Sequence, residues 1–398
     1  MSDLASGTPI TPGTAVSGTL NPGNSTSIYK FNANAGDLIY FDEQGLSGGS
    51  DYYNTNWRLI GPNGQQVWFD DGFGDVGTQA MPSTGTYTLL VEGDVYDTSP
   101  VSYSFNVQNL TQTAVPLTLG SQVSGSILQP SADSFTLANP AHLYFDSLTS
   151  DGTLNWSLIG PTGTLVNQLS FTSSDGINFS SDPVLNLNTG RYFSLRAVGG
   201  STNYAFRLLD LASATPITPG TAVSGSLNPG NSTSIYKFNA NAGDLFYFDE
   251  QSLSGGSGSY YYDTNWRLID PTGQQVWFDD GFSSVGTQAL ASTGTYTLLV
   301  EGYVYNTSPV SYSFNTQKVT NTTAALTVGA TVNGAITQAG QQNFYTFTLA
   351  NASQLYFDSL TNDGSLYWTL TGPRGTEVSS RSFTGSDSSA ISGDPVLN

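Results

Sequence analysis

The sequence predicts an all-β protein of tandem antiparallel β-sandwich modules, four in an A-B-A-B order with the last one incomplete. Three observations predict this class. The chain repeats itself over a unit of about 200 residues, and each unit contains a weaker repeat of about 100 residues, the size of one sandwich. Strand-forming Val, Thr, Tyr and Phe alternate with turns rich in Gly and Pro. No long stretch has apolar residues at helical spacing.

The long repeat is visible as identical segments. Residues 21–31 recur intact as residues 228–238, and residues 84–93 recur as residues 293–302. Identity over such lengths requires the same local structure in both copies. The chain therefore contains two versions of one large unit.

The shorter repeat lies inside each unit. Residues 57–64 (Trp-Arg-Leu-Ile-Gly-Pro-Asn-Gly) resemble residues 156–163 (Trp-Ser-Leu-Ile-Gly-Pro-Thr-Gly). Each unit is therefore two related modules. We place module A1 at residues 7–113, B1 at 114–212, A2 at 213–320 and B2 at 321–398. Short linkers are expected near residues 111–116, 212–217 and 320–325.

The two ends of the chain carry a further indication. Residues 3–6 match residues 210–213, the tail of B1, and B2 has no counterpart of residues 187–211. Two explanations stay open. The chain is a segment of a longer array, or B2 accepts strands from another chain by strand complementation.

Within a module, alternation predicts half-buried strands separated by tight turns. The Gly-Pro-Asn-Gly sequence at residues 61–64 predicts one such turn, because Pro presets φ and the final Gly permits a positive φ. The following side chains of A1 are expected to share one face of their strands: Tyr29 and Phe31; Trp57 and Leu59; Tyr87, Leu89 and Val91; Tyr103 and Phe105.

Composition excludes several classes of protein. The 398 residues include 30 Asp and Glu against 10 Lys and Arg, a formal net charge of −20. Such a surface repels nucleic acid and anionic lipid, so we expect neither as a partner. The absence of cysteine excludes disulfides and thiolate metal sites. No segment approaches 18 consecutive apolar residues, so no membrane insertion is expected.

Catalytic residues are not expected. His142 is the only histidine, and Gln354 replaces it in the second copy, which argues against a Ser–His–Asp triad or a histidine-bound zinc ion. We expect His142 at the surface or a sheet edge. Neighbouring carboxylates such as Asp42 and Glu43 point to opposite faces of a strand, so they do not form a hydrolytic pair. The chain is predicted not to be an enzyme.

An acidic loop makes calcium a candidate ligand. Asp70, Asp71 and Asp75 stand close together in a glycine-containing loop, and calcium prefers several oxygen ligands from such loops. The second copy keeps Asp279 and Asp280 but loses the third carboxylate. The alternative is that Asp and Gly simply favour these turns. No cofactor is required, and calcium is left open.

Aromatic residues of the A modules suggest a ligand surface. If Val67 and Phe69 face inward, then Trp68 faces outward, and Trp277 repeats it in A2. Aromatic rings can stack on sugars or other polymers. The alternative is packing against a neighbouring module. The aromatic residues expected beside these tryptophans are Tyr52, Tyr53, Tyr260 and Tyr261.

The strand motifs resemble those of the bacterial pre-peptidase C-terminal domain, a β-sandwich of secreted proteins. The matching parts are residues 16–20, 29–31, 57–64 and 84–91, and most of the pattern recurs in all four modules. The resemblance implies secretion and an accessory role, with calcium or polymer binding in some members. The acidic residue that the family usually carries before the middle strand is replaced by Asn54 in A1 and is Asp263 in A2, so the resemblance gives less support for calcium at this position.

These observations predict a non-catalytic structural or adhesive repeat region of a secreted or cell-surface bacterial protein. The expected partners are neighbouring repeats, with a glycan or an extracellular protein as further partners. One alternative is a glycan- or protein-binding accessory module of a secreted hydrolase, with or without calcium. A second alternative is a subunit of an extracellular filament that assembles by strand complementation.

Overall fold

The predicted fold class is confirmed by the computed structural model, which is almost entirely β and has repeated sandwich units. It divides into two compact units, residues 1–319 and residues 320–398, which are described separately. No helix of the described part is long and apolar enough to cross a bilayer. The described residues are 3–49, 55–126, 131–176, 179, 181–197, 203–257, 264–387 and 396–397.

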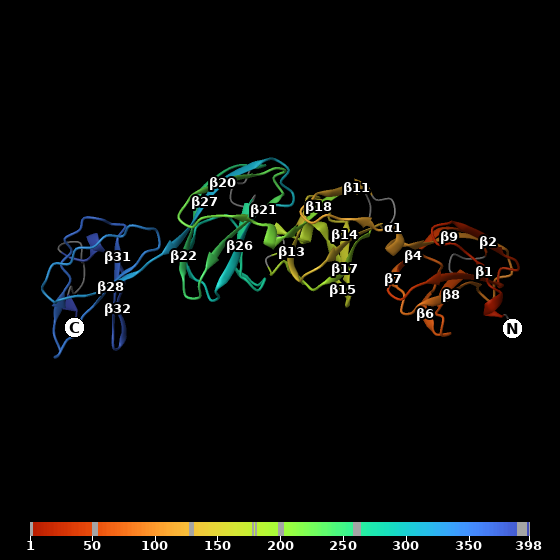
Figure 1. Ribbon diagram of the computed structural model, residues 1–398, viewed down its shortest axis with the longest axis horizontal. Helices are drawn as coiled ribbons and strands as arrows, with labels where there is room; N and C mark the ends of the chain where they lie inside the picture. Colours follow the sequence, from red (N-terminus) through yellow and green to blue (C-terminus); the bar gives the residue numbers. More distant parts are fainter. Residues whose placement is uncertain are drawn as a thin grey trace. The chain divides into compact units, whose positions relative to one another are not determined.

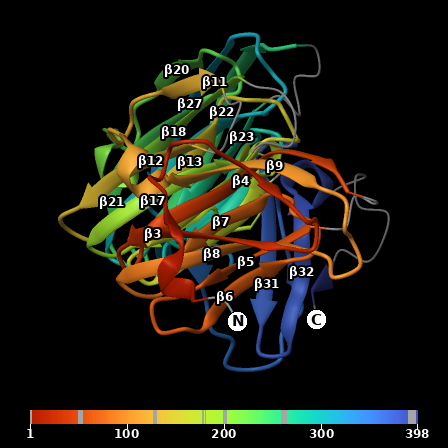
Figure 2. The ribbon, with the colours of Figure 1, turned by 90° about the vertical axis from the view of Figure 1, so that its right-hand side faces the viewer.

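Module A1 is a sandwich of a five-stranded sheet, in the order β1-β3-β8-β5-β6, and a four-stranded sheet, in the order β2-β9-β4-β7 (Figure 1). The strands β3, β8, β5 and β6 can be followed side by side from the A1 end (Figure 2). All pairs are antiparallel except β1 with β3. The strands are β1 (Thr8–Pro9), β2 (Val16–Leu20), β3 (Thr26–Ala33), β4 (Leu38–Gly48), β5 (Thr55–Ile60), β6 (Gln66–Asp70), β7 (Val76–Ala80), β8 (Gly85–Gly93) and β9 (Val101–Asn109).

Module A2 repeats this arrangement, with sheets β19-β21-β26-β23-β24 and β20-β27-β22-β25. The register repeats as well, since Tyr29 faces Leu89 across β3 and β8 and Tyr236 faces Leu298 across β21 and β26. The strands are β19 (Thr215–Pro216), β20 (Val223–Leu227), β21 (Thr233–Ala240), β22 (Leu245–Gly255), β23 (Thr264–Ile269), β24 (Gln275–Asp279), β25 (Val285–Ala289), β26 (Gly294–Gly302) and β27 (Val310–Val319).

Module B1 has the same two-sheet plan, with sheets β10-β12-β17-β14-β15 and β11-β18-β13-β16. Its strands β17 and β18 lie in the middle of the two sheets, so each holds two neighbours together. The strands are β10 (Val115–Pro116), β11 (Val123–Ser126), β12 (Ser131–Leu137), β13 (Ala141–Ser147), β14 (Asn155–Gly160), β15 (Gly163–Ser170), β16 (Val184–Leu187), β17 (Gly190–Ala197) and β18 (Asn203–Asp210), with the 3-10 turn η2 (Phe171–Ser173).

The predicted linkers near residues 111–116 and 212–217 are ordered elements. Helix α1 (Leu110–Thr113) leads into β10, and the 3-10 turn η4 (Leu211–Ser213) leads into β19. The Asp210 side chain accepts a hydrogen bond from the Ala212 N–H, which caps η4. A preceding turn, η1 (Leu4–Ser6), is capped in the same way by Asp3. Within unit 1, regular elements therefore connect each module to the next.

The core of A1 is built as alternation predicts. All nine side chains expected to share strand faces are buried: Tyr29, Phe31, Trp57, Leu59, Tyr87, Leu89, Val91, Tyr103 and Phe105. The Tyr29 and Tyr103 hydroxyl groups are 2.6 Å apart and join the two sheets. This pair requires Gly18, because a Cβ at that position would fall 2.9 Å from the Tyr29 hydroxyl oxygen. The turn at residues 61–64 also forms, with Gly64 at φ 79°.

Unit 2 contains module B2, whose described strands form two-stranded pairs: β28 with β29, β30 with β33 and β31 with β32. Its side chains are poorly covered, since Leu349 is 41% exposed where its B1 counterpart Leu137, a core residue, is 7% exposed. B2 has no counterpart of the central strands β17 and β18, which explains the open core. The elements are β28 (Thr322–Ala325), β29 (Asn343–Thr346), β30 (Leu355–Tyr356), β31 (Tyr367–Gly372), β32 (Gly375–Ser382), η5 (Phe383–Gly385) and β33 (Val396–Leu397).

Candidate functional site

In the acidic loop of A1, Asp70 stabilises the turn by hydrogen bonds. The Asp70 carboxylate accepts hydrogen bonds from the Gly74 N–H at 2.8 Å and from the Trp57 indole N–H at 3.3 Å. The turn places Phe73 at φ 51°, a left-handed conformation, and inserts its buried ring 4.7 Å from the Trp57 ring. Asp71 is exposed. Asp70 therefore has a structural role in this loop.

Asp75 forms hydrogen bonds with a different strand, β4. Its carboxylate accepts hydrogen bonds from the Glu43 N–H and the Tyr40 hydroxyl, both at 2.8 Å. In A2 the Ser284 hydroxyl accepts the equivalent bond from the Glu250 N–H at 3.0 Å. The third carboxylate can thus be lost from the second copy without loss of this contact.

The acidic loop of A2 repeats the same pattern. Asp279 accepts hydrogen bonds from the Gly281 N–H and from both the N–H and the hydroxyl of Ser283, and Asp280 is exposed. Within the described ranges, no three His, Cys, Asp or Glu side chains gather as a metal site would require. Calcium binding stays a prediction for both loops.

The expectation that Trp68 faces outward is wrong. The Trp68 ring packs into the core, 4.9 Å from Phe41 and 5.6 Å from Trp57, while Phe69 is 43% exposed. The register between β5 and β6 shifts beside this position, between Leu59 and Ile60, and the shift breaks simple alternation.

Trp277 packs inward in the same way, 5.0 Å from Phe248 and 5.4 Å from Trp266. Both tryptophans are partly buried and pack against the core of their module. The four tyrosines predicted beside them, Tyr52, Tyr53, Tyr260 and Tyr261, lie outside the described residues.

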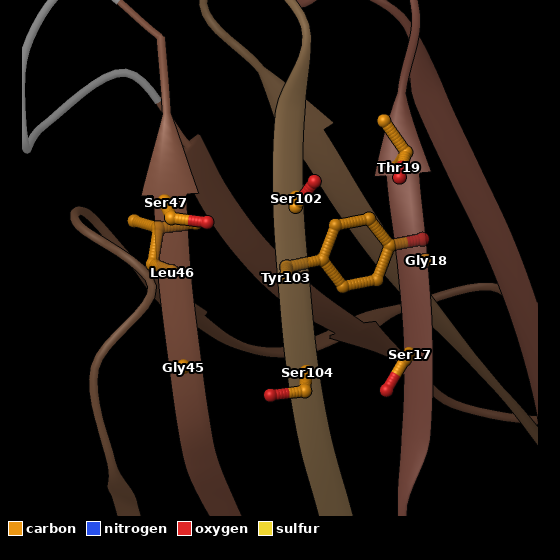
Figure 3. A pocket seen from close by; sticks show the side chains of 9 residues that line it. All are labelled: Ser17, Gly18, Thr19, Gly45, Leu46, Ser47, Ser102, Tyr103 and Ser104. Atoms are coloured by element: carbon orange, nitrogen blue, oxygen red, sulfur yellow. The ribbon is translucent and has the colours of Figure 1, made fainter.

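A shallow hollow lies on the four-stranded sheet of A1, where β2, β9 and β4 run side by side (Figure 3). Its volume is about 520 Å³, and hydroxyl groups line most of it. It carries no ionisable carboxyl, amino or imidazole group. The lining residues are Ser17, Gly18, Thr19, Gly45, Leu46, Ser47, Ser102, Tyr103 and Ser104.

The junction from A1 to B1 is apolar. Leu38, Tyr40 and Leu110 of A1 form one buried cluster with Ala132 and Phe193 of B1. Helix α1 supplies Leu110, so the connecting segment is itself part of the contact. Burial of this cluster stabilises the two modules against separation by the hydrophobic effect.

The junction from B1 to A2 is different, because it encloses charged groups. Arg267 and Glu301 of A2 pair at 2.9 Å, and both side chains are 0% exposed. The Arg267 guanidinium also donates to main-chain carbonyls of B1, at 3.1 Å to Gly176, 2.9 Å to Phe179 and 3.1 Å to Ser181. One side chain of A2 therefore fills a carbonyl-lined socket on B1.

A second ion pair lies at the same junction, on the B1 side, and one of its hydrogen bonds reaches A2. Arg207 of B1 pairs with Asp146 at 2.5 Å and donates to the main-chain carbonyl of Thr233 in A2 at 2.9 Å. Apolar contacts surround the charges, with Tyr144, Leu209 and Leu211 of B1 against Ile269 and Leu299 of A2. B1 and A2 thus each contribute charged and apolar side chains to the junction.

The buried charges do not balance. The junction buries three carboxyl groups, of Asp146, Asp175 and Glu301, against one guanidinium group, of Arg267, while the Arg207 side chain is 25% exposed. Burial raises the pKa of Asp146 to about 6 even though Arg207 lowers it. Burial, followed by the charge of Asp146, raises the pKa of Asp175 well above its usual value. A proton retained on these carboxyl groups offsets the excess negative charge.

His142 also lies at this junction. Its Nδ1 atom is 2.5 Å from the Asn186 side-chain oxygen, and a Cβ on Gly273 of A2 would fall 2.6 Å from the same nitrogen. Its ring is partly exposed, as the prediction of a surface or edge position requires. Gly273 adopts φ 81°, so this close approach depends on glycine.

Sequence reasoning missed the Arg267 site. The available signal was the pair of opposite charges on neighbouring strands, Arg58 with Glu92 and Arg267 with Glu301, which both A modules keep. B1 has Ser157 at the corresponding position. This position is an arginine in both A modules and a serine in B1. The difference indicates that the arginine has a role specific to A modules.

Comparisons with known proteins give no family for this chain. Neither a family model nor a curated protein matches it. The solved structures that resemble parts of it include the periplasmic lysozyme inhibitor PliG of Aeromonas hydrophila, with 18% identity, a TM-score of 0.21, and coverage of 26% of this chain and 96% of the inhibitor.

Two longer matches have even lower identity. The CUB1-EGF-CUB2 region of human MASP-1/3 has 8% identity and a TM-score of 0.17, covering 75% of this chain and 99% of that one. The secreted serine protease VesC of Vibrio cholerae has 10% identity and a TM-score of 0.19, covering 73% and 98%. Likenesses this weak carry no argument about function.

Proposed function

We propose that the chain is a non-catalytic repeat region of a secreted or cell-surface bacterial protein, in which the modules act as a spacer and interaction surface. The observation that carries this proposal is the fully buried Arg267–Glu301 pair at the B1–A2 junction, held by three carbonyls of the neighbouring module. A spacer must keep successive modules in a fixed orientation, and a buried, hydrogen-bonded junction supports that task.

Two further features support the proposal. The A1–B1 junction has its own buried apolar cluster, and the connections between the modules of unit 1 are short ordered elements rather than Gly- or Ser-rich linkers. A1, B1 and A2 each form their two sheets from their own strands, so repeats can be added without changing how such a module folds.

The test measures the stiffness of unit 1. The chain has no cysteine, so Thr86→Cys and Thr295→Cys, at equivalent exposed positions of A1 and A2, permit specific attachment of two dyes. Single-molecule energy transfer is expected to give one narrow distribution. A matched control inserts about ten Gly and Ser residues after Ser213, which should broaden it. A broad distribution without the insertion contradicts the spacer function.

The alternative is a glycan- or protein-binding accessory module of a secreted hydrolase. The hydroxyl-lined hollow of A1 favours it, because hydroxyl groups can donate to and accept from a sugar. A glycan array on the whole chain tests it, with Ser102→Val as the binding variant and Thr86→Val as the control. Binding lost only in Ser102→Val supports the alternative, and absence of binding removes it. Trp68→Ala is unsuitable because that ring belongs to the core.

Calcium dependence is tested separately. A melting scan of the whole chain with and without millimolar calcium reports any binding to the folded state as a rise in Tm. An unchanged Tm removes calcium from the proposal. A rise that Asp71→Asn and Asp280→Asn abolish supports it, because both side chains are exposed.

A further inference from the structure

The two A modules present the same residues on one face of the five-stranded sheet, but only the face of A2 is covered. In A2, Arg267 and Glu301 are fully buried beneath B1. Their counterparts in A1, Arg58 and Glu92, also form an ion pair, but their side chains are 33% and 23% exposed. We call the A1 surface the Arg58 face; it consists of Ile28, Arg58, Ile60, Leu90 and Glu92.

The apolar residues of the Arg58 face follow the same pattern. Ile269 and Leu299 are 1% and 0% exposed against B1, whereas Ile60 and Leu90 are only half-buried. Thr233, whose carbonyl accepts from Arg207, is 5% exposed, whereas its counterpart Thr26 is exposed. The same sequence is therefore an interface in A2 and an open surface in A1.

The segment that enters A1 already has the conformation that it needs at a junction. Asp3 caps η1 as Asp210 caps η4. The Lys30 ammonium donates to the Ala5 carbonyl at 2.5 Å, and Lys237 donates to Ala212 at 2.7 Å.

The strand after each turn then pairs in the same register, with Thr8 opposite Tyr29 and Thr215 opposite Tyr236. The path of the chain into A1 therefore copies the path from B1 into A2.

We propose that the Arg58 face of A1 is a docking surface for a B-type module joined in tandem ahead of Asp3. This inference rests on the proposed function, because it treats the chain as a repeat array. The occupant supplies what B1 supplies to A2: the carbonyls equivalent to Gly176, Phe179 and Ser181 accept from the Arg58 guanidinium, and the side chain equivalent to Arg207 donates to the Thr26 carbonyl.

Other occupants fit this surface less well. An A-type module lacks the Arg207 donor, because Asn106 stands opposite Asp42 where B1 has Arg207 opposite Asp146. Residues 321–398 of a second copy carry no counterpart of Arg207 either. In a second copy, the matching face of B1 is already covered by A2.

The experiment places a second copy of B1 ahead of Asp3. Residues 114–209 of the chain are duplicated and inserted between Ser2 and Asp3, which reproduces the native step from residue 209 to residue 210. Hydrogen exchange of the β5 and β8 amides is then compared with that of β23 and β26. We expect exchange in β5 and β8 to slow at least about tenfold toward the values of β23 and β26.

The matched variant is Arg58→Ala. In the unmodified chain it is expected to speed exchange in β5 and β8 by less than about tenfold. In the fusion it should speed exchange by roughly 100-fold or more, because Glu92 is then left buried without its partner. Equal effects of Arg58→Ala in both proteins would overturn the proposal.

A second fusion keeps the test decisive if the added module folds poorly. Insertion of residues 3–209 between Ser2 and Asp3 gives the added B module its native A neighbour on one side and the Arg58 face on the other. Unprotected β5 and β8 in this fusion contradict the proposal, and so does an added B module less protected than B1. The energy-transfer distribution of the unmodified chain is independent of both fusions, so the spacer function can stand while this inference fails.

Discussion

Substitution of Arg267 by alanine should destabilise A2 much more than Arg58→Ala destabilises A1. The two arginines occupy the same position in strands of identical sequence, β23 and β5. Each guanidinium stacks on a phenylalanine ring, at 4.6 Å from Phe278 and 4.7 Å from Phe69. The contrast therefore isolates one variable, which is coverage by a neighbouring module.

The magnitude follows from the groups left behind. Without Arg267, the fully buried Glu301 carboxylate keeps only Asn265 as a hydrogen-bond donor in the described part of the chain. Three B1 carbonyls each lose one donor, although the Gly176 carbonyl still accepts from the Phe179 N–H. Removing one partner of a buried ion pair costs about 3–5 kcal/mol. A partly exposed pair such as Arg58–Glu92 contributes about 0–1 kcal/mol. The difference should reach at least about 2 kcal/mol, or roughly 30-fold in an opening equilibrium.

Hydrogen exchange with mass spectrometry measures this locally in the whole chain. Arg267→Ala should accelerate exchange in β23 and β26 by roughly 100-fold or more, and Arg58→Ala should accelerate exchange in β5 and β8 by less than about tenfold. The double variant Arg267→Met with Glu301→Leu should recover part of the loss, because an apolar pair of similar volume leaves no uncompensated charge but restores no donor to the B1 carbonyls. Equal acceleration by the two alanine variants would refute the argument from burial.

Three other predictions follow from the same structure. Because the pKa values of Asp146 and Asp175 are raised in the folded protein, the stabilisation is complete below about pH 4 and is lost as the pH rises, for Asp146 through about 6; the urea midpoint for unfolding of unit 1 should fall between pH 4.5 and 8, and an unchanged slope in Asp175→Asn would contradict this origin. Gly273→Ala should destabilise more than Gly64→Ala, since both have positive φ but only Gly273 approaches another module, and equal Tm shifts would exclude the steric cause. Appending residues 187–211 after Asn398 should supply the central strands of B2 and slow exchange in β29 and β31 at least about tenfold, an effect that a scrambled extension should not reproduce.

The alternation of side chains predicted most of the module core. Tyr87 and Leu89 are fully buried as expected, because a regular antiparallel strand sends every second side chain to the same face. The prediction failed at Trp68, where the register shift between β5 and β6 turns the indole inward. A register shift depends on the partner strand, and no local pattern in the residues around Trp68 announces it.

The acidic loops illustrate a different limit. Asp70 and Asp75 stand close together in sequence, and this spacing suggested a shared ligand. In the structure Asp70 fastens the turn that inserts Phe73, and Asp75 holds the Glu43 N–H of another strand. The sequence shows that the loop is rich in Asp and Gly. The role of each aspartate depends on which backbone N–H groups the fold brings near its carboxylate.

The Arg267 site could not be located from local sequence, because an identical segment surrounds Arg58 and has a different environment. Burial of the two arginines differs through the module that precedes each one in the chain, and this is a property of the array. The alternating module order supplies the missing information, since A2 follows a B module. Repeat proteins therefore carry part of their structural information in the order of the repeats.

The two junctions also explain how the order A-B-A-B can be selective. Tyr40 and Phe193 meet in an apolar contact from A1 to B1, and Ser157 stands in B1 where A2 has Arg267. An A module docks on B1 without burying a charge at that position. An A module that directly preceded A2 would cover the Arg267–Glu301 pair without the carbonyl socket that includes Gly176, so guanidinium N–H groups would be buried without acceptors, at a cost of about 1–3 kcal/mol each. The arginine of the A motif thus disfavours an A module as the preceding neighbour of A2, and the apolar residues around it stabilise the contact with B1.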